Sequence, residues 1–160
     1  MNSKLIFLIR FVLIFGAVNA IIYFLDWNFF NQWIAQIIGN LLGLNIIEGN
    51  TFIIQGREIV IANYCNGLTS IGILIGLVLG FSKPSNKSKG KMILVGSIFL
   101  LVVNLMRVIL VVVSGLVFGI SVLEFVHLFS WVILAGVILG FWYWSLKKIG
   151  KIEKLSELIE

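Results

Sequence analysis

Long apolar runs, separated by short polar breaks, occupy most of the chain. They cover roughly Leu5 to Leu25, Gly67 to Phe81, Met92 to Phe118 and Phe125 to Leu146. A transmembrane helix needs about 20 predominantly apolar residues. The pattern therefore predicts an all-α polytopic membrane protein, with four transmembrane helices in a single domain over residues 1–160.

Residues 26–64 form the only sizeable piece outside these runs. Between apolar residues, polar ones recur every four positions, at Asn28, Gln32, Gln36 and Asn40, as in an amphipathic helix that lies in the membrane interface. Over Ile46 to Ala62, β-branched residues alternate in part, with turn signals at Gly49-Asn50 and Gln55-Gly56. We expect an interfacial helix followed by two or three short strands, such as a β-hairpin.

The composition excludes a water-soluble fold, because 60% of the residues are hydrophobic and only 12% are charged. The net charge of +5 has a positional explanation. Lysines and arginines gather before or early in the first run, in the 82–91 loop and after the fourth run. By the positive-inside rule these regions are cytoplasmic, with two spans in each interval. We read these lysines entirely as topology signals: both termini are cytoplasmic, residues 26–64 lie outside, and no nucleic-acid partner is needed.

The start of the chain allows two interpretations. Val18-Asn19-Ala20 follows a basic start and is similar to a weak signal-peptidase site. Hydrophobicity continues from Ile21 to Leu25, which favours an uncleaved first helix. In either case the other three helices keep the same orientation.

Arg107 is the residue least expected inside a membrane. Its cost at the bilayer centre is at least about 2.5 kcal/mol, so it must face protein or water. Counted from Met92, it lies about 22 Å into an apolar core roughly 30 Å thick. Ser97, Asn104 and Ser114 fall on the same helical face, which we expect to point inward.

Two more reactive side chains are predicted at the same outer level. Cys65, the only cysteine, precedes the second run, where Thr69, Gly72, Gly76 and Gly80 mark a side suited to close helix packing. His127, the only histidine, opens the fourth run, with Glu124 one turn before it and Ser130 one turn after it. Three helices would thus bring a thiol, a guanidinium and an imidazole to one layer.

This set of groups suits acyl transfer through a thioester. Nearby positive charge would lower the pKa of the Cys65 thiol, and the thiolate would attack an amide carbonyl. His127 could transfer protons, Arg107 could stabilise the oxyanion and Asn104 could orient Arg107. The sequence has no motif for a metal, haem or nucleotide, so we expect no cofactor.

The residues Cys65-Asn66-Gly67, Asn104 to Arg107 and His127 resemble the signature of the exosortase/archaeosortase family. The resemblance implies a cysteine transpeptidase or peptidase in the cytoplasmic membrane, with its site at the outer face. Its partners would be exported surface proteins with a C-terminal motif, helix and basic tail, and a lipid or other acceptor would receive the cleaved protein. It implies catalytic roles for Cys65, Arg107 and His127. We expect Asn66, Asn104 and Glu124 to be supporting residues of the same site. Many members have more spans, so this chain would be a compact form.

Two other interpretations remain open at the level of sequence. The chain could be a non-enzymatic polytopic subunit or transporter component, in which Arg107 pairs structurally and Cys65 fills space. It could also be a membrane cysteine protease or acyltransferase without sorting-signal specificity. The latter would use the same site and differ only in its acceptor.

Overall fold

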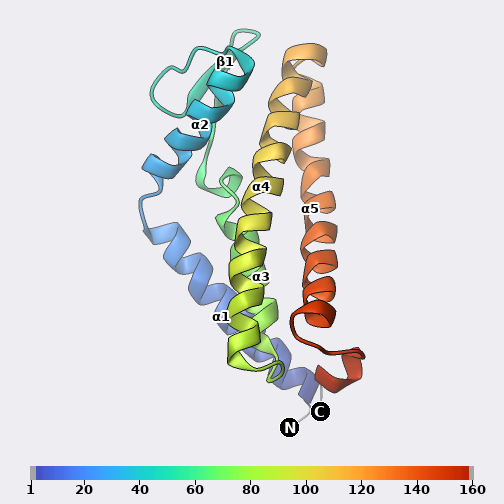
Figure 1. The fold of residues 1–160 in the computed structure, drawn as a ribbon. Coiled ribbons are helices and arrows are strands. Elements are labelled where there is room, and N and C mark those ends of the chain that lie inside the picture. Colours follow the sequence, from blue (N-terminus) through green and yellow to red (C-terminus); the bar gives the residue numbers. More distant parts are fainter. Residues whose placement is uncertain (1–2, 159–160) are drawn as a thin grey trace.

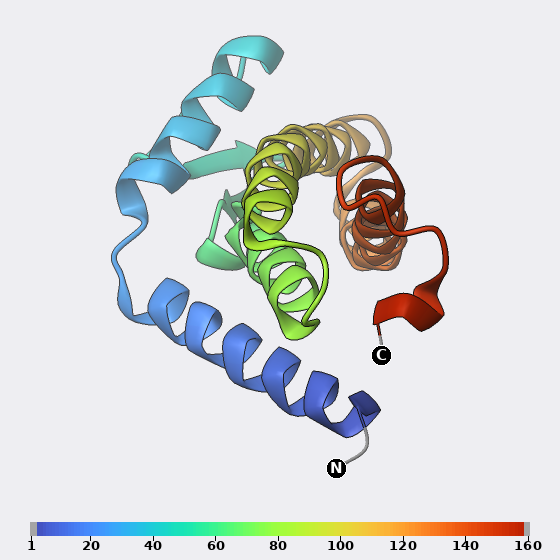
Figure 2. The ribbon, with the colours of Figure 1, turned by 60° about the horizontal axis from the view of Figure 1, so that its bottom comes forward.

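The structure, a computed structural model, describes residues 3–158 and is mostly helical. Helix α3 lies with α4 between α1 and α2 on one side and α5 on the other (Figures 1 and 2). The elements in chain order are α1 (Ser3–Phe24), α2 (Asn28–Leu42), β1 (Thr51–Ile54), β2 (Arg57–Val60), the short 3-10 helix η1 (Asn63–Cys65), α3 (Leu68–Gly80), α4 (Asn86–Phe118), α5 (Ile120–Lys148) and the 3-10 helix η2 (Leu155–Leu158).

Helices α1, α4 and α5 are long and apolar enough to cross a membrane. Helix α3 is apolar but has only 13 residues. At 1.5 Å per residue it is about 20 Å long, against a hydrocarbon core of about 30 Å. Residues 3–158 therefore form a membrane-embedded helical protein with three candidate spans, and the fourth span stays a prediction.

Two helix boundaries differ from the sequence expectation. Helix α4 begins at Asn86, inside the 82–91 segment predicted as a loop, and Ser85 caps it by accepting the N–H of Ser88. Helix α5 begins at Ile120, before the predicted start at Phe125. The predicted boundaries followed the onset of hydrophobicity, whereas the backbone hydrogen bonds of both helices continue into flanking polar or mixed sequence.

Lys89 has a structural role that the topology interpretation did not anticipate. Its side chain is buried, and its Nζ donates hydrogen bonds to the carbonyl oxygens of Phe81 at 2.6 Å and Ser82 at 3.1 Å. These carbonyls follow the last turn of α3, where acceptors lack helical partners. Lys89 thus joins the end of α3 to the start of α4, and reading it only as a topology signal was wrong.

The segment 26–64 folds as the residue pattern predicted. Helix α2 buries Ile34, Ala35 and Ile38 and exposes its stripe of Asn28, Gln32, Gln36 and Asn40. Strands β1 and β2 pair antiparallel, with Thr51 opposite Val60 and Ile54 opposite Arg57, around the Gln55-Gly56 turn. The helix and the hairpin are confirmed.

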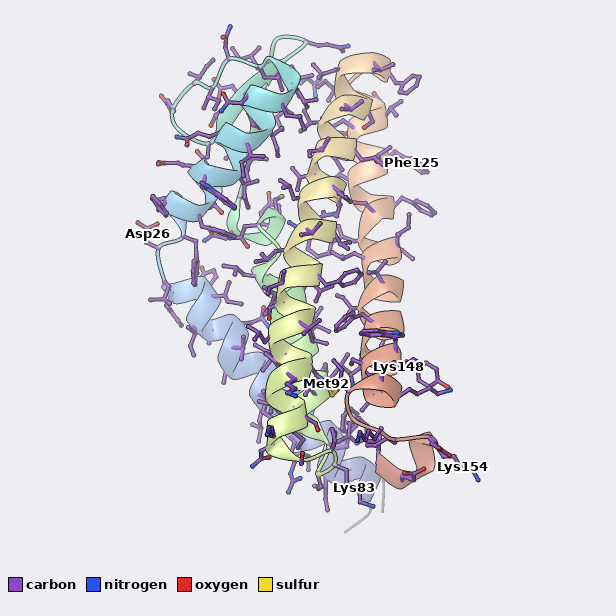
Figure 3. The ribbon with its side chains drawn as sticks, viewed as in Figure 1. Asp26, Lys83, Met92, Phe125, Lys148 and Lys154 are labelled. Carbon is purple, nitrogen blue, oxygen red and sulfur yellow. The ribbon has the colours of Figure 1, made fainter. Side chains whose placement is uncertain are left out.

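The molecule has two distinct ends. Lys83, Lys148 and Lys154 lie at one of them, while Phe125 lies near the opposite end (Figure 3). We call these the basic end and the hairpin end, because α2 and the β-hairpin lie beside the upper half of α4 in Figure 1.

Each end has its own apolar core. The hairpin-end core joins α2, the hairpin and α4 through residues such as Ile38, Phe52 and Val112. The basic-end core joins α3, α4 and α5 through residues such as Leu74, Leu100 and Ile138. Buried polar side chains that form hydrogen bonds make up a third group, the polar layer: Asn31, Asn66, Asn104, Arg107 and Ser130.

Small residues on α3 allow close helix packing, as predicted, and the helix that packs against them is α1. A Cβ atom at Gly72 would lie 3.2 Å from Val18, one at Gly76 would lie 3.1 Å from Phe11, and one at Gly80 would lie 2.9 Å from Phe7. These glycines therefore lie against side chains of α1, leaving the remaining surface of α3 to α4 and α5.

Candidate functional site

Cys65 lies in the turn that leads from the hairpin into α3. Its side chain is buried, with 8% of its surface exposed. The turn depends on Gly67, whose φ of 89° is in the left-handed region, and a Cβ atom there would come within 3.0 Å of Asn104. Asn104 Nδ2 donates to the carbonyl oxygen of Cys65 at 2.7 Å. The nucleophile candidate is thus fixed to α4 through its own backbone.

Arg107 is held by neutral partners on three sides. Its Nε donates to Ser130 Oγ at 2.8 Å, its Nη1 donates to Asn104 Oδ1 at 3.1 Å, and its guanidinium carbon lies 4.2 Å from the centroid of the Trp131 ring. Within residues 3–158 no carboxylate forms an ion pair with it, and its buried Nη2 has no hydrogen-bond partner. Within the described chain the positive charge of Arg107 is therefore not neutralised by a carboxylate, and one of its donors is unpaired.

His127 lies in α5, seven residues after its first residue rather than at its start as predicted. The ring is half-buried and meets Trp131 edge to face, with centroids 6.5 Å apart. Ser130, which accepts from Arg107, donates its hydroxyl to the carbonyl oxygen of His127 at 2.7 Å. One turn of α5 thus positions both His127 and the Ser130 hydroxyl that orients Arg107.

Cys65, Arg107 and His127 all line one cavity of about 330 Å³, which we call the thiol cavity. Glu124 lines it as well, and so do Glu58 and Tyr64. Its volume is in the range of about 300–1,000 Å³ that is typical of ligand sites. Within the described part of the chain, no hydrogen bond joins the thiol, guanidinium and imidazole directly.

Asn66 supports the turn without lining this cavity. Its Oδ1 accepts the N–H of Leu68 at 3.0 Å, and its Nδ2 donates to Asn31 Oδ1 at the same distance. Asn31 in turn donates to Asn63 Oδ1 at 2.7 Å. Asn63 and Asn66, on both sides of Tyr64-Cys65, are thereby tied to α2.

Sequence reasoning missed two residues of this arrangement, Trp131 and Asn31. Trp131 follows His127 by four residues, so helical spacing placed it on the same face, but an aromatic residue in a span gave no separate signal. Asn31 is 2% exposed and lies on the face of α2 that carries Ile34 and Ile38. A polar residue at that spacing within an apolar stripe was the available signal.

The electrostatics of Cys65 differ from the expectation of a lowered pKa. Burial raises the pKa of the Cys65 thiol, and a backbone hydrogen bond at Ala62 and the charge of Arg107 lower it by less. The expectation of a low pKa was wrong because it counted the neighbouring charge but not the desolvation.

Comparison with known proteins identifies the family. The family model for transmembrane exosortases matches residues 3–144, which is most of the chain. The chain belongs to the transmembrane exosortase family. Membership places it among membrane protein-sorting transpeptidases and confirms the resemblance inferred from the sequence. No curated protein and no solved structure matches it.

Proposed function

We propose that this exosortase is a cysteine transpeptidase that cleaves the C-terminal sorting signals of exported surface proteins and transfers these proteins to a lipid or other surface acceptor. The observation that carries the proposal is the thiol cavity. It brings the only cysteine together with a histidine and with an arginine whose charge no described carboxylate neutralises. A structural ion pair would have supported the non-enzymatic alternative.

The proposed reaction has two steps. His127 removes the thiol proton, and the Cys65 sulfur attacks the scissile carbonyl, whose oxygen becomes negatively charged and accepts from Arg107. The C–N bond then breaks, a thioester forms and the leaving amine receives the proton from His127. In the second step an acceptor hydroxyl or amine attacks the thioester, its proton passes through His127 to the sulfur, and the free thiol returns.

The proposed orientation places the basic end in the cytoplasm and the site at the outer side of the cytoplasmic membrane. The lysines at the basic end support this orientation through the positive-inside rule (Figure 3). It requires α3 to complete a fourth span, and both termini are then cytoplasmic. A membrane-impermeant thiol reagent should label Cys65 in intact cells; labelling only after the membrane is broken would contradict this orientation.

The decisive test uses a reporter protein that ends in a short motif, a transmembrane helix and a basic tail, taken from a surface protein of the same genome. Co-expressed with the wild-type chain, the reporter should lose its tail, and Cys65→Ala and Cys65→Ser should abolish this cleavage while inserting normally. The matched control is Asn45→Ala, an exposed position that does not line the thiol cavity.

The mass of the processed reporter separates the remaining alternatives. A mass increased by an acceptor supports transpeptidation, whereas a free carboxyl end shows a protease that uses water. Normal processing by Cys65→Ala would exclude any enzyme that acts through this thiol.

A further inference from the structure

A second cavity, of about 660 Å³, lies next to the Cys65 turn. It is formed by the end of α1, the start of α2, the residue before β1, the end of β2 with the residues that follow it, and the first turn of α3. None of the described residues that line it carries a charge. Its polar lining is mainly carboxamide, and we call it the amide cavity after its five asparagines, Asn19, Asn28, Asn31, Asn50 and Asn63.

Several of these amides hold unused hydrogen-bonding atoms. Asn19 and Asn50 donate to backbone carbonyls at 2.9 and 3.0 Å, which leaves their side-chain oxygens without a partner in the described chain. Asn63 accepts from Asn31, and its Nδ2 donates to no described residue. The cavity thus offers both acceptors and donors. An extended peptide needs both, because its backbone presents N–H and C=O groups in turn.

The amide cavity adjoins the thiol cavity. Tyr64 and Val60 line both of them, and Tyr64 directly precedes Cys65. A chain that crosses Tyr64 can therefore occupy both cavities at about 3.3 Å per residue. The chain of hydrogen bonds from Asn63 through Asn31 to Asn66 also connects the amide cavity to both sides of the Tyr64-Cys65 pair.

We infer that the amide cavity binds an extended, uncharged peptide segment next to the scissile bond of the substrate, through hydrogen bonds to its backbone. The inference rests on the proposed function and names where that substrate is recognised. The two cavities differ in charge. Arg107, Glu58 and Glu124 line the thiol cavity, whereas none of the described residues that line the amide cavity is a cation that would hold a phosphate headgroup.

The test measures initial rates of reporter cleavage against reporter concentration in proteoliposomes. The variants are Asn28→Ala and Thr69→Val, which remove polar groups from the lining without touching Cys65, Arg107 or His127. Each should raise KM about two- to tenfold, the effect of one neutral hydrogen bond, and leave kcat within about twofold. The double variant should raise KM by roughly the product of the two. The control Asn45→Ala should change neither constant.

A second measurement identifies which ligand the cavity holds. At low reporter concentration the variants should form the thioester more slowly, seen as a hydroxylamine-sensitive adduct of protein and reporter. If the adduct instead forms at the normal rate and accumulates, the cavity holds the acceptor and the inference is overturned. An unchanged KM in both variants would also overturn it. If the wild-type chain cleaves no reporter, the proposed function itself has failed.

Discussion

The basic-end core and the polar layer are built by different kinds of contact. The core is specified by shape: a Cβ atom at Gly96 would collide with Leu74 and would lie 2.6 Å from Phe141. The polar layer is specified by hydrogen bonds, with Asn104 serving Cys65 and Arg107 at once. We therefore expect substitutions in the basic-end core to lower mainly the stability, and substitutions in the polar layer to lower mainly the reaction rate.

Arg107→Lys should have the largest effect among variants that keep the thiol. A lysine keeps the charge but loses the planar set of donors that now bind Ser130 and Asn104. We expect reporter cleavage to slow by about 10²- to 10³-fold, as for loss of an oxyanion donor. The matched control is Arg57→Lys at the exposed hairpin, which should cleave normally. Full activity in Arg107→Lys would remove its proposed role.

His127→Ala should slow cleavage by about 10²-fold, within the range for loss of one proton-transfer group. The residual rate should increase with pH, because hydroxide can then replace the imidazole in removing the thiol proton. The measurement is the rate of reporter cleavage from pH 6 to 9 for both proteins. A variant that matches the parent at every pH would show that His127 has no part in the reaction.

Gly96→Val tests the basic-end core, where we expect a loss of stability rather than of reaction rate. The added side chain must displace Leu74 and Phe141, and overpacking of this kind typically costs about 1–3 kcal/mol. The thermal midpoint in detergent should therefore fall, while kcat of the folded fraction stays close to that of the parent. Gly136→Val is the control, since a Cβ at Gly136 has no heavy atom within 4 Å. A lower kcat with an unchanged midpoint would mean that the core and the polar layer are not separable.

The pH dependence of thiol alkylation should give the smallest but most direct signal. Because burial raises the pKa of Cys65, the alkylation rate should increase with pH around a midpoint above the ordinary value of about 8.5. Arg107→Gln should move the midpoint higher still, since it removes a charge that lowers the pKa. By linkage, the stability that the buried thiol contributes is lost as pH rises through that midpoint. A midpoint below 8.5 would contradict this account.

The sequence predicted most where one physical rule dominates. The amphipathic spacing of α2 and the turn signals around β1 and β2 gave the helix and the hairpin. The glycines of α3 predicted a closely packed side, and the structure identifies α1 as the helix that packs there. Arg107 stood out because a charge inside an apolar run is costly, and the predicted topology placed Cys65 and His127 at the same level.

Features that depend on three-dimensional neighbours were not accessible from the sequence. Lys89 lies in a lysine-rich segment, and only the fold shows that its ammonium meets the end of α3. The hydrogen bonds that join Asn31 to Asn63 and Asn66 link residues more than 30 positions apart, so no local sequence pattern predicts them. The pKa of Cys65 depends on burial, which the sequence does not specify.

The close approach of Gly67 to Asn104 has a consequence for how this family can vary. The side chain of Asn104 donates a hydrogen bond to the carbonyl oxygen of Cys65 and accepts one from Arg107. An aspartate at position 104 would lose the first hydrogen bond, and a leucine would lose both. A glutamine at position 104 is longer and would need more space beside Gly67. The turn does not provide it, because a Cβ atom built at Gly67 would already lie 3.0 Å from the Asn104 side chain. We therefore expect positions 67 and 104 to change together among homologous sequences, as a covarying pair, or not at all.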